Sequence, residues 1–264
     1  MAYLAENGWF SPKRVQHVII PEPLNKDRIC LGHRGVLWSE VETFGHIAHG
    51  SMPVLGDCAV RHMGAVVAKI EESLFPVLAK KRTNMPVVPD GARQSTLNIN
   101  SIHGGQGEPE HGYTGLPSAL VPERCRMVLD RRFLMEENLQ DVRSELPDIL
   151  EAVESERAHF RFELREMFSV LPTMTEKEAP VVQAVASAIK SELGCEPEYV
   201  VSPGTYDQKH IDRIGRLKNC IAYGPGILDL AHQPDEYVGI QDMIDSAKVM
   251  AQSLVGLLTS PNNK

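Results

Sequence analysis

Two kinds of apolar spacing follow each other in a fixed order between residues 38 and 168. Where every second residue is apolar the pattern predicts half-buried strands, and where apolar residues recur every three or four positions it predicts amphipathic helices. Strands are predicted in 28–49 (interrupted at Gly35), 95–105, 123–133 and 159–168, and helices in 51–78 (with Asp57 as N-cap) and 135–156. The resulting order is that of a ferredoxin-like (βαββαβ) unit, in which both helices cover one face of a four-stranded sheet.

The segments on either side of this unit have the character of an α/β layer. A buried strand is predicted at 15–20, and beyond residue 169 helices (178–194, from 205, and 237–258) alternate with strands (198–202 and 219–224). We therefore assign residues 1–37 and 169–264 to two parts of one α/β domain, with 38–168 inserted between them. The first residues, "MAYLAENGW", have the pattern of the middle of an amphipathic helix without an N-cap, so we expect the chain to begin inside a fold.

Charge and composition exclude several classes of protein. The formal net charge of -8 disfavours a nucleic-acid-binding surface. There is no run of about 18 apolar residues, so no membrane-spanning segment is predicted, and the first residues lack the pattern of a secretory signal. The five cysteines are scattered without a CxxC pair. This is typical of reduced, mostly buried thiols in a cytoplasmic protein.

Two residues of a metal-binding type follow predicted buried strands. Glu22 lies in "VIIPEPL", and His232 lies in "AHQPDEYV", just after a Gly-Pro-Gly loop. Sites in open α/β sheets lie at the carboxyl ends of strands, and one carboxylate with one imidazole suits zinc or a related divalent ion. Asp235 and Glu236 would orient the imidazole. Taken singly, each position is explained as well by a loop acid or a surface histidine.

Two turns carry further candidates. His49, in "GHIAHGSMP", is predicted to end the first strand of the inserted unit. There it is either an ordinary turn histidine or a proton or hydrogen-bond donor at a domain edge. Gly204 and Thr205, in "SPGTYDQKHI", form a turn before a predicted helix, whose N–H groups can hold an anion.

A pair of arginines lies near a strand end in "VLDRRF". Arg132 comes two residues after Asp130, and its guanidinium can bind a carboxylate through two parallel hydrogen bonds. Arg131 is predicted to face the other side of the strand, where it would be solvated.

Several motifs occur in an order that resembles a known family. They are "PEPL", "GHRGVLWSEVETFGHIAHGSMP", "LNINSIHGG", "VPERCRMVLDRRF", "SPGTYDQ" and "YGPGILDLAHQPDEYV". From residue 15 onward the chain resembles the two-zinc aminoacylase and carboxypeptidase family, which includes acetylornithine deacetylase and succinyl-diaminopimelate desuccinylase. The resemblance implies an α/β zinc-peptidase domain into which the ferredoxin-like unit is inserted as a dimerisation or lid domain. It therefore implies a homodimer formed through residues 38–168.

The resemblance also implies roles for single residues. Glu22 matches the terminal carboxylate ligand of one zinc and His232 the terminal imidazole ligand of the other, with cobalt or manganese as alternative metals. His49 matches the lid histidine that stabilises the oxyanion in the partner subunit's site, Arg132 the arginine that binds the substrate carboxylate, and Gly204 and Thr205 a substrate-contacting turn. The implied reaction is metal-dependent removal of an acyl group from an N-acyl amino acid or peptide-like substrate.

Parts of the family pattern have no counterpart in this sequence. It lacks the His-x-Asp motif, the bridging aspartate and the Glu-Glu pair that supplies the general base, and Ala119 stands where the family often has Asn. Because a catalytic zinc takes about three protein ligands, we expect a truncated enzyme that lacks several ligands and the base. Two alternatives remain open: a non-catalytic dimerisation protein derived from such an enzyme, and an enzyme completed by a separate upstream polypeptide.

Overall fold

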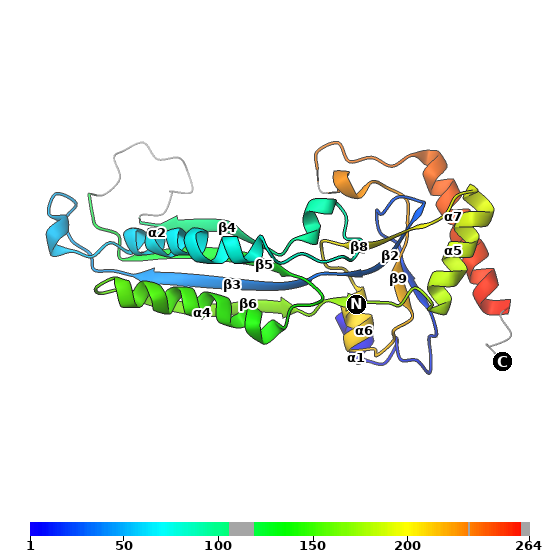
Figure 1. Cartoon of the computed structure of the whole chain (residues 1–264), viewed down its shortest axis with the longest axis horizontal. Coiled ribbons are helices and arrows are strands. Elements are labelled where there is room, and N and C mark those ends of the chain that lie inside the picture. Colours follow the sequence, from blue (N-terminus) through cyan, green and yellow to red (C-terminus); the bar gives the residue numbers. More distant parts are fainter. Residues whose placement is uncertain (106–118, 232, 260–264) are drawn as a thin grey trace. The chain divides into compact units, whose positions relative to one another are not determined.

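The computed structural model describes residues 1–105, 119–231 and 233–259 (Figure 1). The chain forms two compact units. Unit 1 comprises residues 1–35, 84–93 and 171–264, and unit 2 comprises residues 36–83 and 94–170. Among the described helices, none is long and apolar enough to cross a membrane.

Unit 2 is built on a four-stranded sheet with the strand order β4-β5-β3-β6. Its strands are β3 (Gly35–Phe44), β4 (Thr96–Gly104), β5 (Arg124–Phe133) and β6 (Arg161–Val170), and its longer helices are α2 (Ala59–Lys69) and α4 (Leu139–Glu156). β3 pairs antiparallel with β6, and β4 pairs antiparallel with β5. The predicted order of strand, helix, strand, strand, helix, strand is confirmed.

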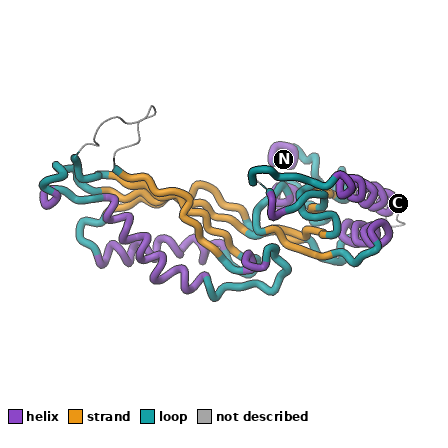
Figure 2. Tube along the Cα trace, turned by 90° about the horizontal axis from the view of Figure 1, so that it is seen from above, coloured by secondary structure: helices purple, strands orange, loops and turns teal. Residues whose placement is uncertain are grey.

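Both helices of unit 2 pack on the same face of this sheet (Figure 2). Met63 and Val66 of α2 and Leu150 of α4 share one core with Met127 and Leu129 of β5, and all five side chains are almost completely buried. Buried and more exposed residues alternate along β5, as the period of two predicts for a sheet covered on one face. Most of the core of unit 2 is therefore an apolar layer between sheet and helices, and Leu37, Phe133 and Val142 form a second, smaller cluster.

The start of α2 differs from the prediction. The helix begins at Ala59, and Cys58 occupies the N-cap position without a side-chain hydrogen bond. The Asp57 carboxylate instead contacts Nε2 of the buried His62 at 2.7 Å, while Nδ1 of His62 accepts a hydrogen bond from Arg157 Nε at 2.6 Å. The prediction of Asp57 as N-cap is wrong because the buried imidazole offers its carboxylate a partner within the fold. Beyond Lys69 the helix continues through a π-helical turn (Ile70–Leu74) into α3 (Phe75–Leu78).

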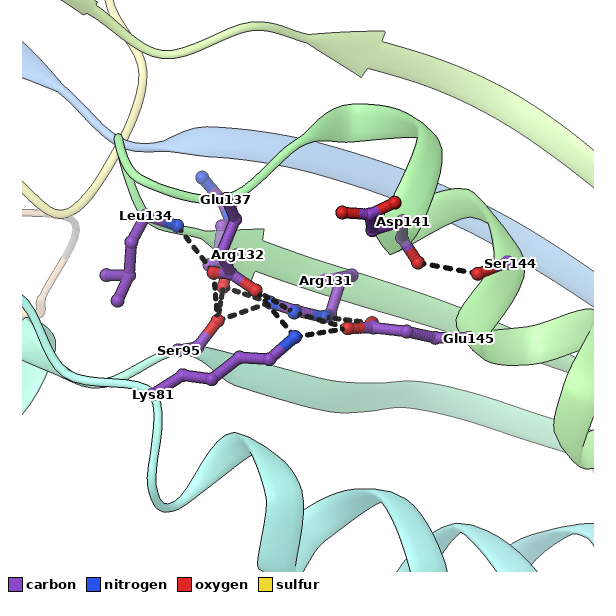
Figure 3. Close-up of polar contacts among 9 residues, drawn as sticks. All are labelled: Lys81, Ser95, Arg131, Arg132, Leu134, Glu137, Asp141, Ser144 and Glu145. Carbon is purple, nitrogen blue, oxygen red and sulfur yellow. Dashed lines mark hydrogen bonds and ion pairs between the residues drawn. The ribbon is translucent and has the colours of Figure 1, made fainter.

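A buried ion cluster holds the end of β5 against the start of α4 (Figure 3). The Arg131 side chain is only 3% exposed, and its Nη2 donates to Glu137 Oε1 at 2.7 Å while its Nε donates to Glu145 Oε2 at 2.7 Å. Lys81 joins the same two carboxylates at 3.1 and 3.0 Å. The expectation that Arg131 is solvated is therefore wrong, because two glutamates from a later part of the chain fold over it.

Replacing Arg131 should destabilise the protein strongly. Arg131→Met leaves the buried Glu137 and Glu145 with Lys81 as their remaining cation, and breaking a buried ion pair on one side costs about 3–5 kcal/mol of unfolding free energy. Urea unfolding of the variant and the wild type measures this loss. Arg126→Met is the matched control, because Arg126 lies on the same strand, is 54% exposed and pairs with Glu40 at 3.4 Å. Its expected loss is below about 1 kcal/mol, and equal losses in the two variants would contradict this account.

Unit 1 is built on a five-stranded sheet. The strands are β1 (Val18–Ile20), β9 (Cys220–Ala222), β2 (Arg28–His33) and β7 (Thr173–Met174), hydrogen-bonded in that order, with β8 (Glu198–Ser202) pairing β2. β1 runs parallel to β9, and β2 runs parallel to β8. The helices are α1 (Ala2–Glu6), α5 (Pro180–Leu193), α6 (Gln208–Arg213) and α7 (Ile240–Thr259). The predicted strands and helices after residue 169 are confirmed.

The residues of β2 explain how the two faces of the unit 1 sheet are filled. Ile29 and Leu31 face a core shared with α5 and α7, whereas Cys30 faces a core shared with Ile211 of α6. The pairing of β2 with β8 shifts register between Cys30 and Gly32. A side chain at Gly32 would lie 2.0 Å from the Thr173 carbonyl oxygen, so only glycine fits this close approach of β2 and β7.

Residues 84–93 lie within the predicted insertion but belong to unit 1. Val87 pairs in parallel with Val201 of β8, and Val201 N–H donates to the Pro86 carbonyl at 3.0 Å. Arg34 Nη1 also donates to the Ala92 carbonyl at 2.9 Å. These backbone contacts explain why the segment joins the α/β unit.

Candidate functional site

One pocket of unit 1 brings together three of the residues predicted to form the site. Glu22, Gly204 and Thr205 line a cavity of about 690 Å³. Glu22 follows β1, and Gly204 and Thr205 follow β8, so the cavity lies at the carboxyl ends of strands, as expected for an open α/β sheet. Lys209, Asp207 and Asp229 line the same cavity. A cation among several carboxylates suits a small polar molecule that carries both charges.

The pairing of β1 with β9 positions Glu22. Ile20 pairs with Ala222, and Tyr223 N–H donates to the Ile20 carbonyl at 3.0 Å. Just beyond this pair, a side chain at Gly224 would lie 2.7 Å from the Glu22 carbonyl oxygen and 3.0 Å from its nitrogen. The glycine after the buried strand "CIAY" therefore lets the two chains run close together and fixes where Glu22 leaves the sheet.

The turn after β8 is held by its own side chains. Gly204 N–H donates to Ser202 Oγ at 3.2 Å, so this N–H already has an acceptor. α6 begins only at Gln208 and is short. The proposed use of these N–H groups as an anion site is thus not supported at Gly204, and the turn contributes as a wall of the cavity.

Lys209 is a site residue that the sequence analysis missed. Its Nζ donates to the Tyr206 carbonyl at 3.1 Å. Burial lowers the pKa of Lys209, and the negative charges of Asp207 and Glu22 oppose that shift. The sequence does contain a signal for this residue. Lys209 follows the Gly-Thr turn in "GTYDQK", at a position that lies in the first turn of the next helix.

A buried polar network lies beside the cavity. Tyr206 Oη donates to Gln208 Oε1 at 2.6 Å, and Gln208 Nε2 donates to the carbonyls of Leu31 and Cys220 at 3.1 and 2.8 Å. Burial raises the pKa of Cys30 to about 11 and that of Cys220 to about 12. Both thiols therefore stay protonated at neutral pH, which argues against a cysteine nucleophile here.

His33 is completely buried beside this network. Its Nδ1 contacts the Arg34 carbonyl at 2.8 Å, and because a carbonyl only accepts, Nδ1 carries the proton. Its ring meets Tyr206 edge-on, with the ring centres 5.3 Å apart. Burial lowers the pKa of His33 to about 4, so the imidazole is neutral in the folded chain at neutral pH.

This histidine should make the protein less stable in acid. Because the folded-state pKa lies below the ordinary value of 6.5, the unfolded chain binds the extra proton between pH 6.5 and about 4. Stability that is present above pH 6.5 is lost as the pH falls, by about 3 kcal/mol once pH 4 is passed. Urea unfolding across this range should show a steeper loss for the wild type than for His33→Asn. Parallel pH profiles of the two proteins would contradict this assignment.

Arg132 and His49 belong to unit 2. The Arg132 guanidinium forms two parallel hydrogen bonds with Asp130, from Nε to Oδ1 at 2.7 Å and from Nη2 to Oδ2 at 2.9 Å. The arginine therefore does bind a carboxylate in the predicted manner, but the carboxylate is that of its own strand. The side chains of Arg132 and Asp130 are 25% and 14% exposed.

His49 is exposed and lies in the loop beyond β3, which ends at Phe44. The prediction that it ends the strand is therefore wrong, although an isolated bridge pairs it with Leu120. Ser51 N–H donates to His49 Nδ1 at 3.2 Å, and Ser51 Oγ lies 2.7 Å from the same nitrogen. Because a backbone N–H can only donate, Nδ1 accepts, and the neutral ring carries its proton on Nε2. The loop thus presents an N–H donor to the surroundings.

The described residues do not assemble a metal site. Within residues 1–105, 119–231 and 233–259, no group of three His, Cys, Asp or Glu side chains is arranged to hold a metal ion. His232, the second predicted ligand, lies outside the described residues. Glu22 also lines a smaller neighbouring cavity with Glu236. The donors seen here do not fit a catalytic metal by themselves, so no reaction step is assigned to one.

Cavity size alone does not identify the site. A larger cavity of unit 1, about 870 Å³, is lined by Pro180, Leu217 and Leu257 among others, and it contains none of the predicted site residues. The smaller cavity is the better candidate because charged residues and strand ends meet there.

Several known proteins have sequences similar to that of this chain. The model of the M20 peptidase dimerisation domain matches residues 31–158. Acetylornithine deacetylase of Myxococcus xanthus is 25% identical over 243 residues, which cover 91% of this chain and 57% of that protein. Succinyl-diaminopimelate desuccinylase of Hydrogenovibrio crunogenus is 22% identical over 252 residues, covering 94% and 60%. The domain match, which covers just under half of the chain, and these relatives support a place in the M20 family. The chain spans about three fifths of the length of these two curated relatives.

The solved structures of a dipeptidase and a metallo-carboxypeptidase share the fold. Human carnosine dipeptidase 1 superposes with a TM-score of 0.76 at 18% identity, covering 98% of this chain and 63% of the dipeptidase. The M20 metallo-carboxypeptidase Sso-CP2 from Sulfolobus solfataricus superposes with a TM-score of 0.70 at 19% identity, covering 97% and 66%.

Proposed function

We propose that this chain belongs to an M20 hydrolase that removes the acyl group from an N-acyl amino acid or a peptide-like substrate. The main support is the cavity at the strand ends of unit 1, where Glu22, Gly204, Thr205 and Lys209 meet. The similar curated proteins are a deacetylase and a desuccinylase of amino acids, and a similar solved structure is a dipeptidase. Their names describe the removal of an acetyl or a succinyl group and the cleavage of a dipeptide.

The chemistry of each side chain suggests its role in substrate binding or in the reaction. The Arg132 guanidinium binds the substrate carboxylate. The His49 Nε2–H donates to the oxygen that becomes negative as the amide is attacked, in the site of a partner subunit. Gly204 and Thr205 contact the substrate from the cavity wall. The metal is zinc, with cobalt or manganese as alternatives, and its proposed ligands in this chain are Glu22 and His232.

The arrangement of the units is part of the same proposal. The strand order and helix placement of unit 2 support a ferredoxin-like dimerisation or lid domain inserted into an α/β catalytic domain. On this proposal residues 1–37 and 169–264 are parts of the catalytic domain, residues 38–168 form the insertion, and the protein is a cytoplasmic homodimer paired through it.

A second candidate function is dimerisation without catalysis. The dimerisation-domain match covers residues 31–158, whereas the described residues contain no three-ligand group for a metal. Metal content separates the two candidates. The purified chain is dialysed against zinc, freed of excess zinc and analysed by plasma mass spectrometry. One or two zinc ions per chain support the hydrolase, and zinc near zero together with a dimer in sedimentation supports the second candidate.

If the zinc-loaded chain hydrolyses N-acetyl-L-ornithine, His49→Ala should lower kcat by roughly a hundredfold, the usual cost of one oxyanion donor. The matched control is His46→Ala, because His46 is an exposed histidine of the same loop. Its kcat should stay within about twofold of the wild type. A His49→Ala variant as active as this control would contradict the role assigned to His49.

Loss of the Arg132 guanidinium should weaken substrate binding more than turnover. We expect Arg132→Met to raise KM by roughly ten- to a hundredfold, since a hydrogen-bonded charge pair with substrate is worth about 1.5–3 kcal/mol. N-acetyl-L-ornithinamide, which lacks the carboxylate, should show no such difference between wild type and variant. An equal effect on both compounds would assign Arg132 to another task.

A further inference from the structure

Arg132 is held from both faces of its strand. On the helix-covered face, the buried Arg131 side chain donates a hydrogen bond from its Nη1 to the Arg132 carbonyl at 2.7 Å. On the other face, the Arg132 side chain is bound by Asp130, which lies two residues earlier and therefore on the same side of β5. The buried ion cluster thus fixes the backbone, and Asp130 fixes the guanidinium.

The geometry of the Asp130 pair leaves one edge of the guanidinium available. Asp130 uses Nε–H and one N–H of Nη2, which together form the side-on edge of the group. A guanidinium has five N–H donors, so both N–H groups of Nη1 and the second N–H of Nη2 remain. In the described part of the chain, no other polar partner of the Arg132 side chain is found. One N–H of Nη1 and the second N–H of Nη2 form the end-on edge, which can hold a second carboxylate through two parallel bonds.

We propose that Asp130 is a positioning residue that aims the end-on edge of Arg132 at the substrate carboxylate. The inference rests on the proposed function, because it takes Arg132 as the carboxylate-binding residue. Asp130 keeps its own bonds when the substrate binds, so the two carboxylates share one guanidinium through different edges. The long arginine side chain is ordered before binding, which removes part of the entropy cost of recognition.

Displacement of Asp130 by the substrate is the competing arrangement, and burial disfavours it. Asp130 is only 14% exposed, and leaving Arg132 would leave its carboxylate partly buried without this partner. The shared guanidinium also makes the site selective for the shape of the substrate group. Because Asp130 neutralises the charge of Arg132, binding depends on a planar group that matches the end-on edge, and a carboxamide of the same shape lacks the second acceptor oxygen.

The arginine Nε–H signals in ¹⁵N-edited NMR spectra of the full chain test this directly. The signal of Arg132 is assigned by its loss in Arg132→Lys. In the wild type we expect slow solvent exchange of this Nε–H, both alone and with excess N-acetyl-L-ornithine, while the Nη signals shift on adding the compound. Asp130→Asn should accelerate Nε–H exchange and weaken binding of N-acetyl-L-ornithine roughly tenfold, with little effect on its carboxamide.

Glu166→Gln is the matched control. Glu166 binds Arg143 through the same side-on edge, with Nε at 2.8 Å and Nη2 at 2.9 Å, elsewhere in unit 2. This variant should change the Nε–H exchange of Arg143 and leave both Arg132 and the affinity for N-acetyl-L-ornithine unchanged.

Three results would overturn the inference: loss of Nε–H protection when the compound binds the wild type, tighter binding by Asp130→Asn, or rapid Nε–H exchange in the free wild type. The first and third do not need Asp130→Asn, so they decide the question even if that variant folds poorly. A different result separates the proposed function from the inference. If the compound binds but Arg132→Lys and Asp130→Asn bind it as the wild type does, Arg132 is not the carboxylate site, although Asp130 still holds its Nε–H.

Discussion

The buried pairing of Arg131 with Glu137 and Glu145 is the interaction on which the rest of unit 2 depends. A guanidinium that is 3% exposed is stable only if its charge and donors are matched, and two glutamates supply the match. Burial by itself would raise the pKa of Glu137, but the charge of Arg131 and hydrogen bonds from Ser95 and the Leu134 N–H bring it below its ordinary value. The cluster therefore stays ionised and ties β5 to α4.

This cluster also connects structure to the proposed chemistry. Arg131 and Arg132 are neighbours on β5, so the strand places one on the covered face and the other on the opposite face. The Arg131 side chain holds the end of the strand through its ion pairs and donates a hydrogen bond to the carbonyl of Arg132. A rigid backbone with a side chain held by Asp130 is the kind of support that a recognition residue needs, because small displacements weaken two parallel hydrogen bonds together.

In unit 1, the position of the candidate site depends on backbone segments that approach each other closely. Gly224 allows the chain after β9 to pass the backbone of Glu22, and Gly32 allows β7 to approach β2. Lys209, in the first turn of α6, lines the cavity at the strand ends together with Glu22. The short strands leave few positions for site residues, which is why those that follow β1 and β8 line the same cavity.

The sequence by itself determined the order of helices and strands, because periods of two and of three to four residues are local and survive in the final fold. It also determined that Glu22, Gly204 and Thr205 follow buried strands, and hence that they lie at one edge of a sheet. Only the tertiary structure decided the partners of charged groups. Asp57 was mistaken for a helix cap and Arg131 for a solvated residue because His62, Glu137 and Glu145 reach them through folding of the chain. For the same reason the sequence did not predict Lys209 as a site residue, the hydrogen bonds between Asp130 and Arg132, or the place of residues 84–93 in unit 1. Burial and charge pairing depend on neighbours in space, which local spacing does not encode.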